Sequence, residues 1–186
     1  MELQHLNFKF FVEPPYPELE PFVPVFHRWI QQQVFSPAML IDVADYSHVK
    51  DGPGVVLIGH EYDYNLDQTG GRLGLRFSQK ASIEGSNAEV LKRSFQTALA
   101  GLALLEGETA HPIRFSRNDF EISVNDRAIA PNNLETLEKF RPDVEAFLKS
   151  ALGGAPTLKH HADPRVRFGF EVHSDTAVDW KAIAAR

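Results

Sequence analysis

Residues 40–77 read LIDVADYSHVKDGPGVVLIGHEYDYNLDQTGGRLGLRF. Two short apolar runs, Met39–Ala44 and Val55–Ile58, flank the turn-forming segment Asp51–Gly54, and Arg72–Ser78 alternates apolar residues with arginine and glycine. Short apolar or alternating runs bounded by glycine, proline and aspartate are typical of β-strands joined by loops. The stretch therefore predicts three strands, the first two of them buried.

The residues before this stretch predict one strand and one helix. Even-numbered positions in Leu6–Val12 are apolar, which gives the two-residue period of a half-buried strand. In Phe22–Val34 the apolar residues recur three and four positions apart, as on one face of a helix. This helix should end before Ser36-Pro37, because the residue before a proline disfavours helical geometry.

The residues after the stretch predict two long helices, each opened by a capping pattern. A Ser-x-x-Glu pattern begins a helix over residues 86–107, and an Asn-x-x-Glu pattern begins another over residues 132–152. Pro142 stands inside the second helix and lacks a backbone N–H. We therefore expect that helix to kink or restart there.

Three further elements are predicted in the second half of the chain. Ile113–Phe115 and Phe120–Val124 indicate a hairpin that turns at Asn118-Asp119. Apolar residues alternate with polar ones over Val166–Val172, which predicts a strand. A capping pattern at Thr176–Asp179 then predicts a short C-terminal helix.

Together these elements predict an α+β fold in a single domain over residues 1–186. We expect a mixed β-sheet with hairpins, about three covering helices and a short C-terminal helix. The 186 residues are 43% hydrophobic and 24% charged, a composition typical of folded globular proteins. A chain of this length can bury one large core.

Several classes of function are excluded by what the sequence lacks. The chain has no cysteine, which excludes disulfides, thiolate zinc sites and a cysteine nucleophile. It has no nucleophile elbow of the α/β-hydrolase type, and it has no Walker loop, so nucleotide-dependent chemistry is not indicated. Its apolar runs are short and residues 1–5 do not resemble a signal peptide, so we expect a cytoplasmic protein without membrane association.

Negative charge concentrates in the first part of the chain. The net charge is -6; residues 1–71 hold 10 acidic and 3 basic residues, whereas residues 72–186 hold 15 and 16. Because general binding to nucleic acid needs a basic face, we expect no nucleic-acid partner. The acidic first part better suits a cation or a basic protein partner.

Four titratable residues near the strand ends form the candidate catalytic or ligand-binding site: His48, His60, Glu61 and Asp63. An imidazole beside a carboxylate can bind a divalent metal or act as a general base. The pair His60-Glu61 does not begin a metalloprotease motif, because Tyr64 stands where the second histidine is needed. The sequence alone does not decide whether the protein is an enzyme.

Two other motifs are predicted to be structural. Asp63–Asp67 opens like a calcium-binding loop, but Gln68 and Gly74 replace the required glycine and glutamate, so we predict a solvated turn. His160 and His161 are adjacent, and adjacent side chains on an extended chain point in opposite directions. We therefore predict a surface loop there and not a metal site.

Arg72 and Arg76 are a candidate anion-binding pair. Both should face the same side of their strand, and guanidinium pairs suit carboxylates and phosphates. Lys159, Arg165 and Arg167 would extend this site if the two segments are neighbours in the sheet.

Two hypotheses of function follow. In the first, the protein binds a small ligand or a metal at the strand ends near residues 45–67. In the second, it is a non-catalytic interaction protein or homodimer that uses its acidic N-terminal part. The second hypothesis predicts an affinity that falls steeply with salt.

Overall fold

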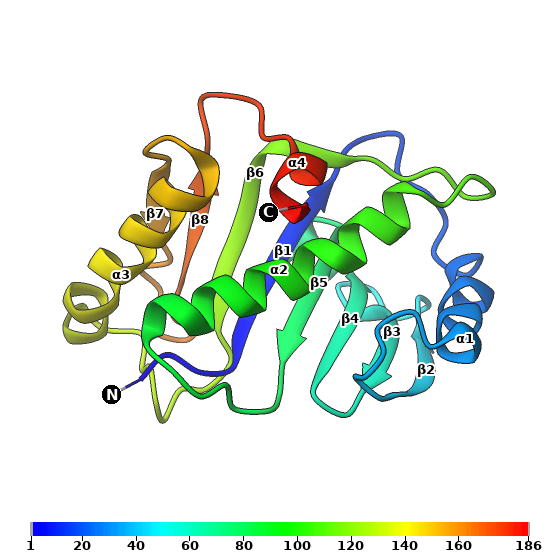
Figure 1. Ribbon diagram of the computed structural model, residues 1–186, viewed down its shortest axis with the longest axis horizontal. Helices are drawn as coiled ribbons and strands as arrows, with labels where there is room; N and C mark the ends of the chain where they lie inside the picture. Colours follow the sequence, from blue (N-terminus) through cyan, green and yellow to red (C-terminus); the bar gives the residue numbers. More distant parts are fainter. Residues whose placement is uncertain (1, 186) are drawn as a thin grey trace.

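A single β-sheet of eight strands organises residues 2–185, which the computed structural model describes. The strands are β1 Leu6–Val12, β2 Leu40–Tyr46, β3 Gly54–Gly59, β4 Tyr62–Asp67, β5 Gly74–Gln79, β6 Phe115–Val124, β7 Thr157–His160 and β8 Gly169–His173. The helices are α1 Phe22–Gln32, α2 Asn87–Glu106, α3 Leu134–Leu152 and α4 Trp180–Ala184, with a 3-10 turn, η1 Thr69–Gly71, between β4 and β5. The strand order is β2-β3-β4-β5-β1-β6-β8-β7 (Figure 1).

Every strand pairing within residues 2–185 is antiparallel. The α+β class is therefore confirmed, although the sheet is antiparallel throughout and not mixed. Strands β2 to β5 follow one another through hairpin connections, which force antiparallel pairing. Strand β1 lies between β5 and β6, and α2 crosses over it to connect these two strands (Figure 1).

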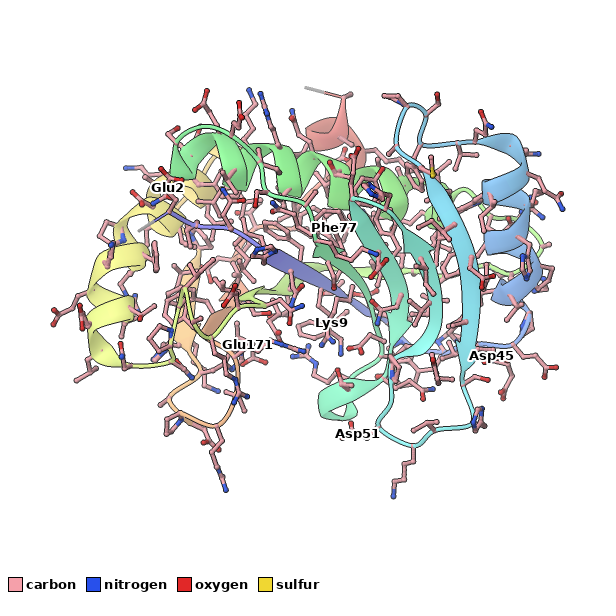
Figure 2. All side chains as sticks on the ribbon, turned by 90° about the horizontal axis from the view of Figure 1, so that it is seen from below. Glu2, Lys9, Asp45, Asp51, Phe77 and Glu171 are labelled. Carbon is pink, nitrogen blue, oxygen red and sulfur yellow. The ribbon has the colours of Figure 1, made fainter. Side chains whose placement is uncertain are left out.

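The face of the sheet toward the helices is apolar. Phe8 and Phe10 of β1 point to this face, where the Phe8 ring centroid lies 5.2 Å from that of Phe95 in α2. The Phe10 ring centroid lies 5.1 Å from that of Trp180 in α4. Phe77 is paired with Phe8, and it points toward the helices in Figure 2. Full burial stabilises the fold by about 1.5–3 kcal/mol for each such side chain.

The opposite face of the sheet is polar, and none of the four described helices covers it. Side chains alternate along a strand, so Lys9 and Glu171 point away from the helices (Figure 2). We call this surface the open face. The segment between β4 and β5 packs against its centre: Lys9 Nζ donates to the Thr69 carbonyl at 2.7 Å, and the Arg72 guanidinium carbon lies 3.4 Å from the Phe11 ring centroid.

Two segments predicted as a turn and a loop are strands. Tyr62–Asp67, which includes the supposed turn, forms β4 and pairs with both β3 and β5. His160 ends β7, and the His161 N–H donates to the Gly169 carbonyl, which continues the pairing with β8. The polar residues in these segments therefore occupy fixed positions in the sheet.

Three local predictions in the second half also need correction. Asn118 and Asp119 do not form a hairpin turn but lie inside β6, where the Ser116 hydroxyl oxygen accepts both of their N–H groups. The third helix, α3, includes Pro142 and does not restart there, so the restart is wrong and the kink stays a prediction. Its N-cap is Asn133, whose side chain accepts the Thr136 N–H.

In the part of the chain that the structure describes, no helix has the length and apolar character needed to cross a membrane.

Candidate functional site

The strand ends do not bring the four predicted site residues together. His48 lies in the loop that joins β2 to β3, whereas His60, Glu61 and Asp63 belong to the turn and first residues after β3. Because β2 and β3 are antiparallel, these two loops lie at opposite ends of β3. The structure therefore separates His48 from the other three residues.

Asp63 holds the β3–β4 turn in place. Its Oδ1 accepts the Gly59 N–H at 3.0 Å and lies 2.7 Å from Lys80 Nζ. Lys80 also donates to the Gly59 carbonyl. The Asp63 carboxylate is therefore engaged by the turn and by Lys80, which follows β5.

His60 and Glu61 line a cavity of about 610 Å³ between the β3–β4 turn and α2. Tyr62 and Arg93 are among the other lining residues. Burial, together with the charge of Glu61, raises the pKa of Tyr62 to about 12. Neither Glu61 nor Arg93 forms an ion pair with another residue in the range 2–185.

The sequence left open whether the candidate site binds a divalent metal. Within residues 2–185, no group of three or more histidine, aspartate or glutamate side chains is arranged to hold a metal ion.

A denser group of charges lies on the open face, around Asp67 at the end of β4. This carboxylate is fully buried, and its Oδ2 lies 2.6 Å from Lys9 Nζ and 2.9 Å from Arg76 Nη2. The Thr69 hydroxyl donates to the same oxygen at 2.6 Å. Lys9 and Arg76 are direct partners in the β1–β5 pairing, which places both next to Asp67. Two cations thus share one carboxylate.

Arg167 adds a third cation from the segment between β7 and β8. Partial burial and the nearby charge of Arg76 lower the pKa of Arg167. Its side chain forms no ion pair or hydrogen bond with the rest of residues 2–185. We call Lys9, Arg76 and Arg167 the cationic cluster.

The negative charge of Glu121 partly compensates the positive charge of the cationic cluster. It is paired with Lys9 across β1 and β6, and its charge acts to raise the pKa values of Lys9 and Arg167. Burial has the larger effect, so the pKa of Lys9 is lowered overall. The cluster therefore holds three cations against the carboxylates of Asp67 and Glu121.

A second group of charges lies beside the cationic cluster. Arg72 Nη1 lies 2.9 Å from Glu171 Oε1, and Lys159 Nζ lies 3.6 Å from the other oxygen of that carboxylate. Arg165 is instead paired with Asp163, at 2.7 Å. The basic residues before β5 and within it therefore lie on the same face of the sheet as the basic residues of β7 and of the β7–β8 segment. The sequence alone did not decide whether these two groups are neighbours.

The sequence did not identify Lys9 or Asp67 as site residues. Lys9 is one of two polar residues, with Asn7, in the otherwise apolar strand β1, and Asp67 belongs to the segment predicted as a turn. The alternation of Tyr62, Tyr64 and Leu66 with polar residues was the signal that could have placed Asp67 in a strand.

The chain matches no protein-family model, no curated protein and no solved structure. Its candidate site is therefore defined by the geometry of its own side chains.

Proposed function

We propose that the protein binds a small anionic molecule, a carboxylate or a phosphate, at the cationic cluster. The observation that carries this proposal is the charge imbalance: Lys9 and Arg76 share the Asp67 carboxylate, and Arg167 has no ion-pair partner in residues 2–185. An anion between Arg76 and Arg167 would supply negative charge there. The two planar guanidinium groups suit bidentate binding of either anion.

The burial of the cationic cluster favours a small ligand over a protein partner. The side chains of Lys9 and Arg76 are 3% and 14% exposed, so a flat protein surface does not reach them. Arg167 is exposed and can receive an anion from solvent. Coulomb attraction is also stronger at a partly buried site than in water.

Calorimetric titration with inorganic phosphate and with malonate tests the proposal. We expect Arg167→Gln to weaken binding at least about tenfold, because hydrogen bonds to charged groups contribute about 1.5–3 kcal/mol. Arg93→Gln is the matched control: it removes another exposed arginine, from α2 on the helical side of the sheet. Absence of binding, or equal affinities in the wild type and Arg167→Gln, would reject the proposal.

A second candidate function is binding of a small zwitterion in the cavity lined by His60 and Glu61. The supporting observation is that Glu61 and Arg93, of opposite charge, line this cavity and form no ion pair in residues 2–185. Free amino acids carry matching charges. If this second function is correct, an amino acid in a thermal-shift screen raises the melting temperature of the wild type. The increase is lost in His60→Ala and in Arg93→Gln but is kept in Arg167→Gln.

A further inference from the structure

Helices α2, α3 and α4 lie on the same side of the sheet, away from the open face (Figure 1), and a groove of about 450 Å³ lies between them. We call this space the helical groove. Most of its lining is apolar: Ala88 and Phe95 of α2, Ala146, Phe147 and Ala151 of α3, and Ile183 of α4. Ligand pockets in proteins measure about 300–1,000 Å³ and are mostly apolar. The helical groove therefore has the size and the lining of a site for a small organic molecule.

Small side chains on the two long helices leave the helical groove open to solvent. Ala88 of α2 and Ala146 and Ser150 of α3 line it, and all three are exposed. Phe147 is half-buried, and its ring centroid lies 5.5 Å from that of the buried Phe95. A ligand can thus enter from solvent and contact an aromatic side chain without a change in the fold.

The helical groove extends along both long helices. α2 lines it from Ala88 to Gln96, and α3 lines it from Asp143 to Ala151. Each span covers eight residues, or about 12 Å of helix. A linear alkyl chain of medium length matches an apolar space of this extent.

Lys92 places a positive charge at the helical groove. It lines the groove, is exposed, and forms no ion pair with another residue in the range 2–185. A lysine of this kind covers apolar surface with its methylene groups and keeps its ammonium group in water. An anionic group at the end of a bound alkyl chain can therefore pair with Lys92 at the edge of the groove.

Asp143, the acidic residue of the lining, already has a structural partner. Its Oδ2 accepts a hydrogen bond from Asn87 Nδ2 at 2.6 Å, and Asn87 Oδ1 accepts the Leu3 N–H at 2.7 Å. Asp143 thus helps to join the N-terminal segment to α2 and α3. Lys92, in contrast, lacks an oppositely charged partner, so the helical groove favours an anionic ligand over a cationic one.

We infer that the helical groove binds a free fatty acid of medium chain length. The alkyl chain lies against Phe147 and Ile183, and the carboxylate pairs with Lys92. Burial of the alkyl chain supplies most of the affinity, and the ion pair selects the head group. The helical groove is separate from the cationic cluster, so this inference does not depend on the proposed function.

Three ligands with the same alkyl chain test the choice of head group: octanoate, octylammonium and octanol. By calorimetry we expect the wild type to bind octanoate about fivefold more tightly than octylammonium, because Lys92 attracts one head group and repels the other. Lys92→Gln should weaken octanoate binding about threefold and leave octanol binding unchanged. Lys149→Gln is the matched control: it removes an exposed lysine of α3 outside the groove lining, and octanoate should bind as in the wild type.

Two further variants test the location of the site. Ala146→Trp places a large ring in the helical groove from an exposed helical position, which the fold should tolerate. We expect it to weaken octanoate binding at least about tenfold, because the alkyl chain loses its space. Octanoate is also a carboxylate, so Arg167→Gln distinguishes the groove from the cationic cluster. Binding of octanoate in the groove should be unchanged in Arg167→Gln.

The outcomes separate this inference from the proposed function. Failure of the wild type to bind octanoate would overturn the inference and leave phosphate binding at the cationic cluster intact. Equal affinities for octanoate and octylammonium would overturn the choice of an anionic head group. Loss of octanoate binding in Arg167→Gln but not in Ala146→Trp would overturn the location. The comparison of head groups on the wild type does not depend on the folding of any variant.

Discussion

At the scale of the residue, Asp67 allows two cations to lie side by side inside the sheet. Replacing it with the isosteric asparagine leaves Lys9 and Arg76 buried without this shared negative charge. Removal of one partner from a buried ion pair costs about 3–5 kcal/mol. We expect Asp67→Asn to lower the free energy of unfolding in urea by about that amount.

An exposed ion pair provides the control for Asp67. Glu145 pairs with Arg141 on α3 at 3.0 Å, with both side chains well exposed to solvent. Glu145→Gln should change the unfolding free energy by less than about 1 kcal/mol. If Asp67→Asn lowers the free energy of unfolding by no more than Glu145→Gln does, the burial of Lys9 and Arg76 does not depend on the charge of Asp67.

His173 gives the protein a pH-dependent contribution to stability. Its Nδ1 hydrogen-bonds to Asp119 Oδ1 at 2.8 Å, and this bond raises the pKa of His173 above 6.5. The folded state therefore holds the proton more tightly than the unfolded state. The stabilisation is fully present below the unfolded pKa, about 6.5, and is lost as pH rises through the folded value.

Melting temperatures measured from about pH 5 to pH 9 test this contribution. We expect His173→Gln to be less stable than the wild type at the acidic end, and the difference to vanish at the alkaline end. His27→Gln is the control, because His27 is exposed and forms no ion pair within residues 2–185. A difference between His173→Gln and the wild type that is constant with pH would contradict the role of the Asp119 bond.

At the scale of the element, α2 approaches the sheet closely where Gly101 faces Tyr64. A Cβ atom at position 101 would clash with the Tyr64 ring, whose hydroxyl donates to the Thr97 carbonyl. Alanine is favoured over glycine in helices by about 1 kcal/mol, but overpacking costs about 1–3 kcal/mol. We expect Gly101→Ala to be destabilised in urea unfolding. Gly154→Ala, where the added atom meets nothing within 4 Å, serves as the control.

Local patterns were sufficient to predict most of the elements. The alternation in Leu6–Val12 matches β1, and the Ser86-x-x-Glu89 capping box opens α2 as expected. The prediction of a turn at Asp63–Asp67, inside β4, is wrong because the aspartates and asparagine there are typical of turns, although they alternate with apolar residues. Aspartate and asparagine can occupy the open face of a sheet. Their alternation with apolar residues is then a better indicator of a strand than their preference for turns is of a turn.

The candidate site was less predictable than the elements because it depends on pairing between distant strands. The sequence made Arg76 a candidate anion-binding residue, but nothing near it in the sequence shows that Lys9 is its partner across β1 and β5. The separation of His48 from His60 likewise follows from the antiparallel direction of β2 and β3. Strand order and direction are long-range properties that residue periodicity does not specify.

At the scale of the whole molecule, the acidic first part of the chain is partly neutralised by the second part. Asp63 and Asp67 pair with Lys80 and Arg76, since β4 and β5 are neighbours. The acidic surface available to a basic protein partner is therefore smaller than the composition suggests. The open face, in contrast, collects cations in a molecule whose net charge is -6.

Ligand binding at the open face should stabilise the entire fold. The cationic cluster joins β1, β5 and the β7–β8 segment, so the site exists only when the centre of the sheet is formed. At a free ligand concentration about 100 times Kd, we expect inorganic phosphate to raise the unfolding free energy by about 2.7 kcal/mol. Urea unfolding at the same ligand concentration should show this increase in Arg93→Gln and an increase of at most about 1.4 kcal/mol in Arg167→Gln, whose binding is at least about tenfold weaker. Equal increases in both variants would place the ligand elsewhere.

The central position of β1 also bears on how the chain folds as it leaves the ribosome. β1 is synthesised before its neighbours β5 and β6, which begin only at Gly74 and Phe115. Until those residues emerge, Phe8 and Phe10 have no strand beside them and remain available to chaperones or to other nascent chains. The interval between the synthesis of β1 and that of β6 is thus one in which the chain is exposed to misassembly.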